Sequence, residues 1–271
     1  MSFRKDYVLG THDEEIERLG LQHLAWRERA QEAWRSAGIG PGQTVLDVGC
    51  GPGYAALDLA DLAGSTGRVV AIDKSERFLR VLNARCLERH IENITTHLAD
   101  LDAGEFPEVI ADRAWVRWVL AFVKNPRAIL AQMAAVLTAG GVIVVHEYFD
   151  YSTWRAAPRC AEVEEFVSAV MASWRDNGGE PDIALSLPRW LEELGFKIRS
   201  ARPIVDIVQP GDLSWRWLAT FLEVGRSRLV EMGSLSSSRA ESIWQAFAEF
   251  EGAAGARMMT PGVLEIVAER R

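Results

Sequence analysis

The segment DVGCGPG (residues 47–53) constrains the fold more than any other part of this sequence. It follows a short, β-branched apolar run, TVLDVG (44–49), and precedes a helical pattern, YAALDLADLAG (54–64). Glycine adopts backbone conformations that other residues avoid and lets the chain approach a ligand closely. The start of a helix leaves backbone N–H groups free. A strand, a glycine turn and a helix in this order predict an α/β sheet with a ligand site beyond the end of its first strand.

The pattern on either side of this segment extends the sheet. Strand-like runs recur at 68–73, 94–100, 113–120 and 140–147, and helical patterns separate most of them. Alternating strands and helices imply right-handed crossovers and a parallel sheet. The runs RVVAID and VIVV are apolar on both sides, as expected for strands that helices cover on both faces. Strand-like runs KIRSARPI (197–204) and GVLEIVAER (262–270) complete the set.

We therefore expect an α/β fold with a seven-stranded, mostly parallel Rossmann-like sheet and helices on both faces. A helical pattern that begins after Thr11, with Glu14 three residues later as in a capping box, predicts an N-terminal helix. Helical patterns at 212–232 and 237–251 predict a lid inserted between the last two strands. The expected division is an N-terminal segment and helix (1–40), a sheet domain (41–207 with 256–271) and a helical lid (208–255).

Two acids stand at the ends of further strands. Asp73 ends the second strand, and Asp100 ends the third. Ligands of open parallel sheets bind beyond the carboxyl ends of the strands, where a carboxylate can accept hydrogen bonds from ribose hydroxyls. The alternatives are that Asp73 caps the following helix and that Asp100 is a solvated loop acid. A dinucleotide fingerprint would need glycine where Tyr54 stands, which disfavours a nicotinamide oxidoreductase.

The pattern D-x-G-x-G-x-G at 47–53, with both acids, resembles motif I and the strand ends of class I S-adenosylmethionine (SAM)-dependent methyltransferases. Region 43–147 resembles this family in general, including its ubiquinone/menaquinone-biosynthesis type. The segments YVLG (7–10), with Glu14 and Arg18 after it, and RWVL (117–120) look like a narrower group of bacterial small-molecule methyltransferases. The resemblance implies SAM as cofactor and S-adenosylhomocysteine (SAH) as product. It implies cofactor contacts from Tyr7, Asp47, Gly49, Cys50, Gly51, Gly53, Asp73, Lys74, Asp100, Leu101 and Arg117.

In that group the N-terminal segment covers the cofactor, so Tyr7 is expected over the methionyl end of SAM; alternatively, it packs the helix onto the sheet. Transfer from a sulfonium depends mainly on proximity and orientation, and a base can assist it. His146, Glu147 and Arg117 are the candidate catalytic residues. Adjacent strand residues point to opposite faces, so only one of His146 and Glu147 can face the transfer site directly. Each could instead be a polar strand end, and Arg117 an ion-pair partner.

The acceptor is expected to be a small apolar or aromatic metabolite that is methylated on O, N or C. The chain has ten tryptophans, and aromatic faces can stack on an aromatic substrate or hold a cation. Trp118, Tyr148, Trp154 and Trp217 are the candidate substrate contacts, although an aromatic residue is more often plain core. The sequence has no NPPY-like tetrapeptide after the fourth strand and no convincing acid set for magnesium. We therefore expect metal-independent chemistry and no nucleobase substrate.

Composition limits the partners. The net charge is −8, which disfavours nucleic acid as a partner. No apolar run approaches a membrane span, and the N-terminus resembles no signal peptide. Three scattered cysteines suit reduced thiols, so we expect a cytoplasmic protein. We also expect it to be a monomer or homodimer. The alternative from another functional class is a SAM-binding protein that does not transfer methyl: a scaffold, a regulatory subunit or a SAM-assisted enzyme.

Overall fold

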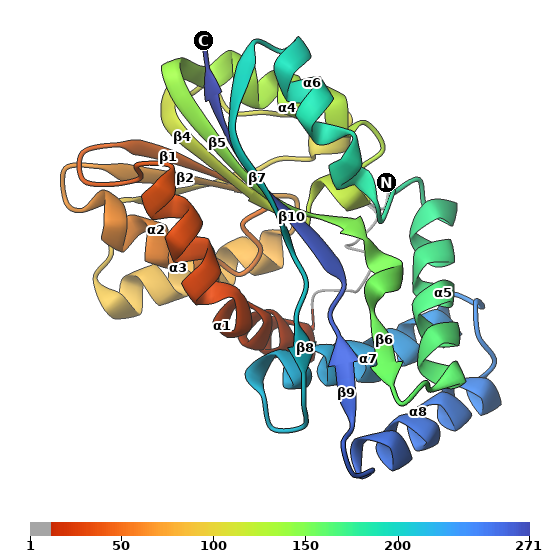
Figure 1. Cartoon of the computed structure of the whole chain (residues 1–271). Helices are drawn as coiled ribbons and strands as arrows, with labels where there is room; N and C mark the ends of the chain where they lie inside the picture. The colour runs from red at the N-terminus through yellow and green to blue at the C-terminus, as the bar shows by residue number, and fades with distance from the viewer. Residues whose placement is uncertain (1–11) are drawn as a thin grey trace.

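The fold is known from a computed structural model, which describes residues 12–271. Seven strands form the main sheet in the order β3-β2-β1-β4-β5-β10-β7 (Figure 1). Strand β10 pairs antiparallel with β5 and β7, whereas the other neighbours in the sheet pair in parallel. The predicted seven-stranded, mostly parallel sheet is therefore confirmed. Its strands are β1 (Thr44–Val48), β2 (Arg68–Asp73), β3 (Ile94–Leu98), β4 (Ala111–Arg117), β5 (Leu137–Asp150), β7 (Phe196–Ile204) and β10 (Gly262–Arg270).

Helices cover both faces of this sheet, as expected. Alternate strand residues point to opposite faces, so Val45 packs with α1, α2 and α3, whereas Leu46 packs with α4 and α6. Both faces of the central strands are therefore dry, which explains their nearly continuous apolar sequence. The helices are α1 (Asp13–Ser36), α2 (Tyr54–Ala63), α3 (Glu76–Arg89), α4 (Pro126–Val136) and α6 (Leu187–Glu193).

A second group of elements lies beyond the carboxyl end of β5 (Figure 1). Helices α5 (Ala161–Asp176), α7 (Leu213–Glu231) and α8 (Ser237–Glu251) share one aromatic-rich core with a small sheet. That sheet has the order β6 (Arg155–Ala157), β9 (Arg257–Met259) and β8 (Ile207–Val208). The sequence did not predict it, because strands of two or three residues are too short to show a period. Helices α7 and α8 do lie between β7 and β10.

The fourth strand ends earlier than its sequence predicts. The expected range was 113–120, but β4 stops at Arg117 and Leu120–Phe122 form a single helical turn. The chain turns at Trp118, whose φ of 52° is in the left-handed region. None of the described helices is long and apolar enough to cross a membrane. The domain boundaries given above, and any movement of a lid, stay predictions.

Candidate functional site

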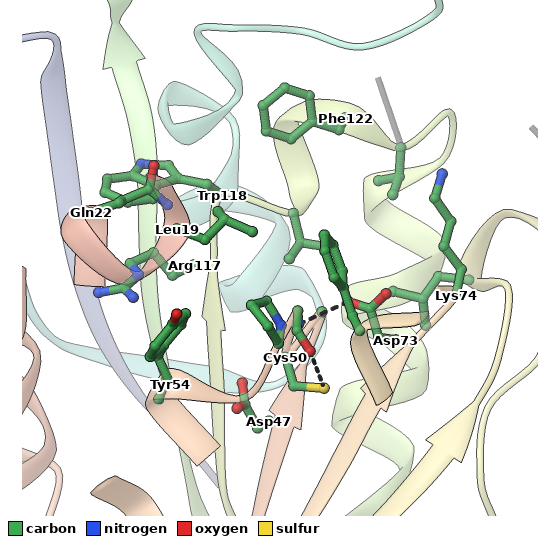
Figure 2. Close-up of a pocket in the computed structure, with 18 of the residues that line it drawn as sticks. Leu19, Gln22, Asp47, Cys50, Tyr54, Asp73, Lys74, Arg117, Trp118 and Phe122 are labelled. Carbon is green, nitrogen blue, oxygen red and sulfur yellow. Dashed lines mark hydrogen bonds between the residues drawn. The ribbon is translucent and has the colours of Figure 1, made fainter. Parts of the chain in front are cut away.

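A cavity opens beyond the carboxyl ends of β1, β2 and β4 (Figure 2). Its walls come from the glycine turn, α1, the segments that follow β2, β3 and β4, and residues of β5, α5 and α7. The empty space is about 1250 Å³ when its open mouth is included. Eleven predicted site residues line it: Asp47, Gly49, Cys50, Gly51, Asp73, Lys74, Asp100, Leu101, Arg117, Trp118 and Tyr148.

The glycine turn needs glycine for different reasons at different positions. Gly49 and Gly51 have φ of 70° and 54°. A Cβ on Gly49 would lie 2.2 Å from Cγ2 of Val119, whereas a Cβ on Gly51 would enter open space at the cavity wall. Gly53 does not line the cavity, because it lies behind the turn, where a Cβ would meet Leu82 of α3 at 2.3 Å. Gly53 was expected to touch a cofactor; here it allows close packing of α2 and α3.

The carboxylate of Asp73 ties this turn to the end of β2. One oxygen, Oδ2, accepts the N–H of Gly51 at 2.9 Å, and Oδ1 accepts the N–H of Ser75 at 2.8 Å. Burial raises the pKa of Asp73, and these hydrogen bonds oppose the rise. Each carboxylate oxygen can accept a second hydrogen bond. Asp73 can therefore shape the turn and also accept a ligand hydroxyl.

The next strand end is built in a similar way. Asp100 Oδ1 accepts the N–H of Asp102 at 3.0 Å, and its backbone N–H donates to Glu105 at 2.7 Å. These bonds hold the turn that follows β3, in which Asp100 and Leu101 form part of the cavity wall. Asp100 and Asp73 therefore lie at the ends of two adjacent parallel strands, as expected for the nucleoside side of a ligand.

Asp47 and Arg117 form a polar pair on the other side of Cys50 from Asp73 and Lys74 (Figure 2). Burial raises the pKa of Asp47 to about 7, although the charge of Arg117 opposes this. Burial also lowers the pKa of Arg117 to about 10. Oδ2 of Asp47 and Nη1 of Arg117 are buried and have no hydrogen-bond partner among residues 12–271. A buried acid and a buried cation, each with an unused atom, suit a ligand that carries an ammonium and a carboxylate together.

Aromatic side chains close the part of the cavity next to α5 and α7. They are Trp118, Phe122, Tyr148, Trp174 and Phe221. The ring of Trp118 stacks between those of Tyr148 and Trp217, with centroids 5.4 and 5.6 Å away. A left-handed backbone at a non-glycine residue costs about 1–3 kcal/mol and often marks a functional position. The fold therefore holds Trp118 in place at some cost.

Neither His146 nor Glu147, both candidate catalytic residues, lines the cavity. Both are fully buried. His146 Nε2 lies 3.0 Å from a carboxylate oxygen of Glu265 on β10, whereas Oε1 of Glu147 accepts the N–H groups of Val119 and Leu120, both at 2.7 Å. Because both faces of β5 are covered, both side chains form hydrogen bonds with neighbouring elements and not with the cavity.

Two further candidates, Trp154 and Trp217, also lie away from the cavity wall. Trp154 is buried in the second core and donates to the sulfur of Met258 at 3.5 Å. Trp217 stands behind Trp118, and its Nε1 donates to Gln22 at 3.2 Å. Tyr7 lies outside the described residues. Both tryptophans belong to the aromatic core, which is where an aromatic residue is more often found than in a binding site.

Sequence reasoning missed the contribution of α1. Arg18, Leu19, Gln22 and His23 line the cavity, although none was a candidate. One signal was present, since these polar residues fall on the apolar face of an otherwise amphipathic helix. Burial of a polar group is costly unless it is hydrogen-bonded. Arg18 pairs with Glu15 through two bonds of 2.7 Å, and His23 bonds to Asp58 at 3.2 Å.

Comparison with known proteins identifies the family. A methyltransferase-domain model matches residues 45–141. The ubiquinone/menaquinone biosynthesis C-methyltransferase UbiE of Cupriavidus metallidurans is 32% identical over 173 residues, which cover 59% of this chain and 70% of that enzyme. The chain belongs to the class I SAM-dependent methyltransferases. UbiE of Cupriavidus taiwanensis is 33% identical over 147 residues, 54% of this chain and 58% of the enzyme.

The extent of these matches differs between sequence and structure. The chain spans 56–58% of the length of the first curated relatives that it matches. The partner of the Trm112 methyltransferase activator in a solved Haloferax volcanii complex matches at a TM-score of 0.60 and 17% identity, over 99% of both chains. That likeness shows that the class I methyltransferase fold accommodates the whole chain, including α5, α7 and α8.

The site fits the cofactor of this family. SAM has a nucleoside end and a methionine end. The cavity has acids at two adjacent strand ends and, beyond the glycine turn, the Asp47–Arg117 pair, in which one buried atom of each residue has no partner among the described residues. Cys50 of the glycine turn lies between Asp73 and the Asp47–Arg117 pair (Figure 2), and a Cβ on the neighbouring Gly51 would enter open space. No cluster of three or more potential metal ligands occurs among His, Cys, Asp and Glu of the described part of the chain.

Proposed function

We propose that this protein transfers the methyl group of SAM to a small, largely apolar aromatic acceptor. The observation that carries the proposal is a single cavity with two chemically different parts. One part has the glycine turn and the acids of β1, β2 and β3, and the other has five aromatic side chains. A methyltransferase needs its cofactor and acceptor in one space, because transfer depends on proximity and orientation.

The polar part of the cavity is assigned to SAM. We assign the methionine ammonium to Asp47, the methionine carboxylate to Arg117 and the ribose hydroxyls to Asp73. Asp100 and the backbone of Leu101 are assigned to the adenine, as in the family that the sequence resembles. Bound SAM supplies an activated methyl group on its sulfonium. The residues of this chain bind it, orient it and exclude water from it.

The aromatic part is assigned to the acceptor. UbiE relatives are named for C-methylation in ubiquinone and menaquinone biosynthesis, which supports a quinone-type ring as the acceptor. Trp118 and Tyr148 stack on each other in this part of the cavity wall, and aromatic side chains can pack against such a ring. We assign His146 and Glu147 a role in holding the strand end and the turn after β4 in position, because His146 is hydrogen-bonded to Glu265 and Glu147 to the backbone of Val119 and Leu120. Transfer is proposed to be metal-independent.

The remaining expectations are part of the same proposal. The three cysteines are free thiols, which supports a cytoplasmic location. The protein acts on a small molecule as a monomer or homodimer, with no nucleic acid or membrane partner. Tyr7 is proposed to cover the methionyl end of the cofactor, and residues 208–255 to act as a lid over the acceptor.

Calorimetric titration with SAM and SAH tests the cofactor site. We expect saturable binding of both by the wild type and a large loss in Asp73→Ala. Asp61→Ala, which changes an exposed acid on α2, is the matched control and should bind both ligands normally. No binding by well-folded wild-type protein would refute the proposal.

A turnover assay tests the second part of the proposal, which is methyl transfer to an aromatic acceptor. SAH release is measured with a panel of hydroquinones, phenols and aliphatic amines, and the first two classes should be methylated. Tight SAM binding without methylation of any acceptor class would favour the SAM-binding protein without methyl transfer. Methylation of aliphatic amines alone would refute the aromatic acceptor.

A further inference from the structure

Two side chains, His23 in the cavity wall and Asp58 behind it, connect Arg117 to the helical layer. Nη2 of Arg117 lies 3.2 Å from Nδ1 of His23, and Nε2 of His23 lies 3.2 Å from Oδ2 of Asp58. Arg27 holds the same carboxylate through contacts of 2.7 and 2.9 Å. Arg117 comes from β4, His23 and Arg27 from α1, and Asp58 from α2. No sequence motif joins these four residues.

The chemistry of the three groups sets the direction of each hydrogen bond. A guanidinium can only donate, so Nδ1 of His23 accepts from Arg117. The proton of the neutral imidazole is then on Nε2, which donates to Asp58. Burial lowers the pKa of His23 although Asp58 opposes this, and bonds from His23 and Arg27 lower the pKa of Asp58 to about 2 against the effect of its burial. At neutral pH, Asp58 is therefore a carboxylate, His23 is neutral and Arg117 is a cation.

This arrangement holds the guanidinium without neutralising it. The group is planar, so a bond at Nη2 also fixes the direction of Nη1. The rings of Trp115 and Trp118 lie 5.6 and 5.2 Å from its central carbon and confine it further. A carboxylate directly on Arg117 would compete with a ligand carboxylate for the same charge. A neutral imidazole does not compete, and Nη1 has no partner among the residues that the structure describes.

We propose that His23 and Asp58 are positioning residues that hold Arg117 ready for the carboxylate of the cofactor's methionine end. The proposal rests on the assignment of this cavity to SAM. It explains why His23 of α1 is buried against Arg117 of β4, where α1 packs against the sheet. It also predicts that the pair acts on one end of the cofactor only, because the nucleoside side of the cavity lies beyond Cys50 (Figure 2).

Two ligands separate this role from a general structural one. SAH carries the amino-acid end, whereas 5′-methylthioadenosine has the same adenine, ribose and thioether without it. In His23→Leu we expect SAH affinity to fall about tenfold or more and the affinity for 5′-methylthioadenosine to stay within about twofold. His23→Asn should restore most of the SAH affinity, because its side-chain oxygen can accept from Arg117.

One control changes another residue of α1, and a second variant changes Asp58, the hydrogen-bond partner of His23. Arg29→Ala breaks the Arg29–Asp206 ion pair of 2.6 Å, which tethers α1 elsewhere, and SAH affinity should stay within about twofold. If His23→Leu fails to fold by circular dichroism, Asp58→Asn provides the test, and it should weaken SAH but not 5′-methylthioadenosine. Unchanged SAH affinity, or equal losses for both ligands, in a folded variant would overturn the proposal. Failure of the wild type to bind SAH would instead refute the cofactor site itself.

Discussion

Glu147 should make the stability of this protein depend on pH in a direction opposite to that of most acids. The side chain is fully buried beneath the turn after β4. Burial raises its pKa from 4.5 to about 8, although the backbone N–H groups of Leu120 and Val119 oppose the rise. The folded protein therefore holds a proton on Glu147 at pH values where the unfolded chain has released it.

The size of the effect follows from linkage. Because the folded-state pKa is the higher one, the contribution of Glu147 to the free energy of unfolding is greatest below pH 4.5 and is lost as the pH rises through 8. For these two pKa values the loss between pH 6 and pH 8 is about 2 kcal/mol. Glu147→Gln keeps an oxygen for Val119 and Leu120 but does not titrate.

Urea unfolding of both proteins at pH 6, 7, 8 and 9 measures this difference. Subtracting the wild-type curve from that of Glu147→Gln removes the contributions of other groups, including Asp47 and His146. We expect the difference to move by about 2 kcal/mol in favour of the variant between pH 6 and pH 8. A difference that is flat with pH, or that moves in favour of the wild type, would show that Glu147 is ionised throughout and would refute this reasoning.

Three further predictions concern the cavity and its support. Gly51→Ala should lower SAH affinity at least about tenfold by calorimetry, because its methyl group enters the cavity and its φ disfavours any side chain. SAH affinity of the wild type should rise from pH 5.5 to pH 7.5 as Asp47 ionises with a pKa of about 7, and Asp47→Asn should remove that dependence; a persistent slope would exclude Asp47. Trp217→Ala should cost about 3–5 kcal/mol in urea unfolding. Trp217→Phe should cost about 1 kcal/mol for the lost bond to Gln22; equal losses would argue against the stack on Trp118.

Much of the polar part of the cavity wall was predictable from local sequence. The positive φ angles at Gly49 and Gly51 favour glycine at those positions, so the turn is visible in the sequence itself. Asp73 and Asp100 were found because parallel strands bring their carboxyl ends to one edge, and strand ends can be recognised from period and composition. The start of α4 is also determined locally, because the side chain of the N-cap residue Asn125 accepts the N–H of Ala128.

Only the tertiary structure decided which polar groups near that edge are left for a ligand. The two-residue period of a strand placed His146 and Glu147 on opposite faces of β5. It could not show that His146 is hydrogen-bonded to Glu265 and Glu147 to the turn after β4. His23 and Arg117 are 94 residues apart in sequence and meet only because α1 packs on the sheet. A local pattern determines backbone conformation and the face of an element. The partner of a buried polar atom depends on which elements pack together, and so it is settled only when the chain folds.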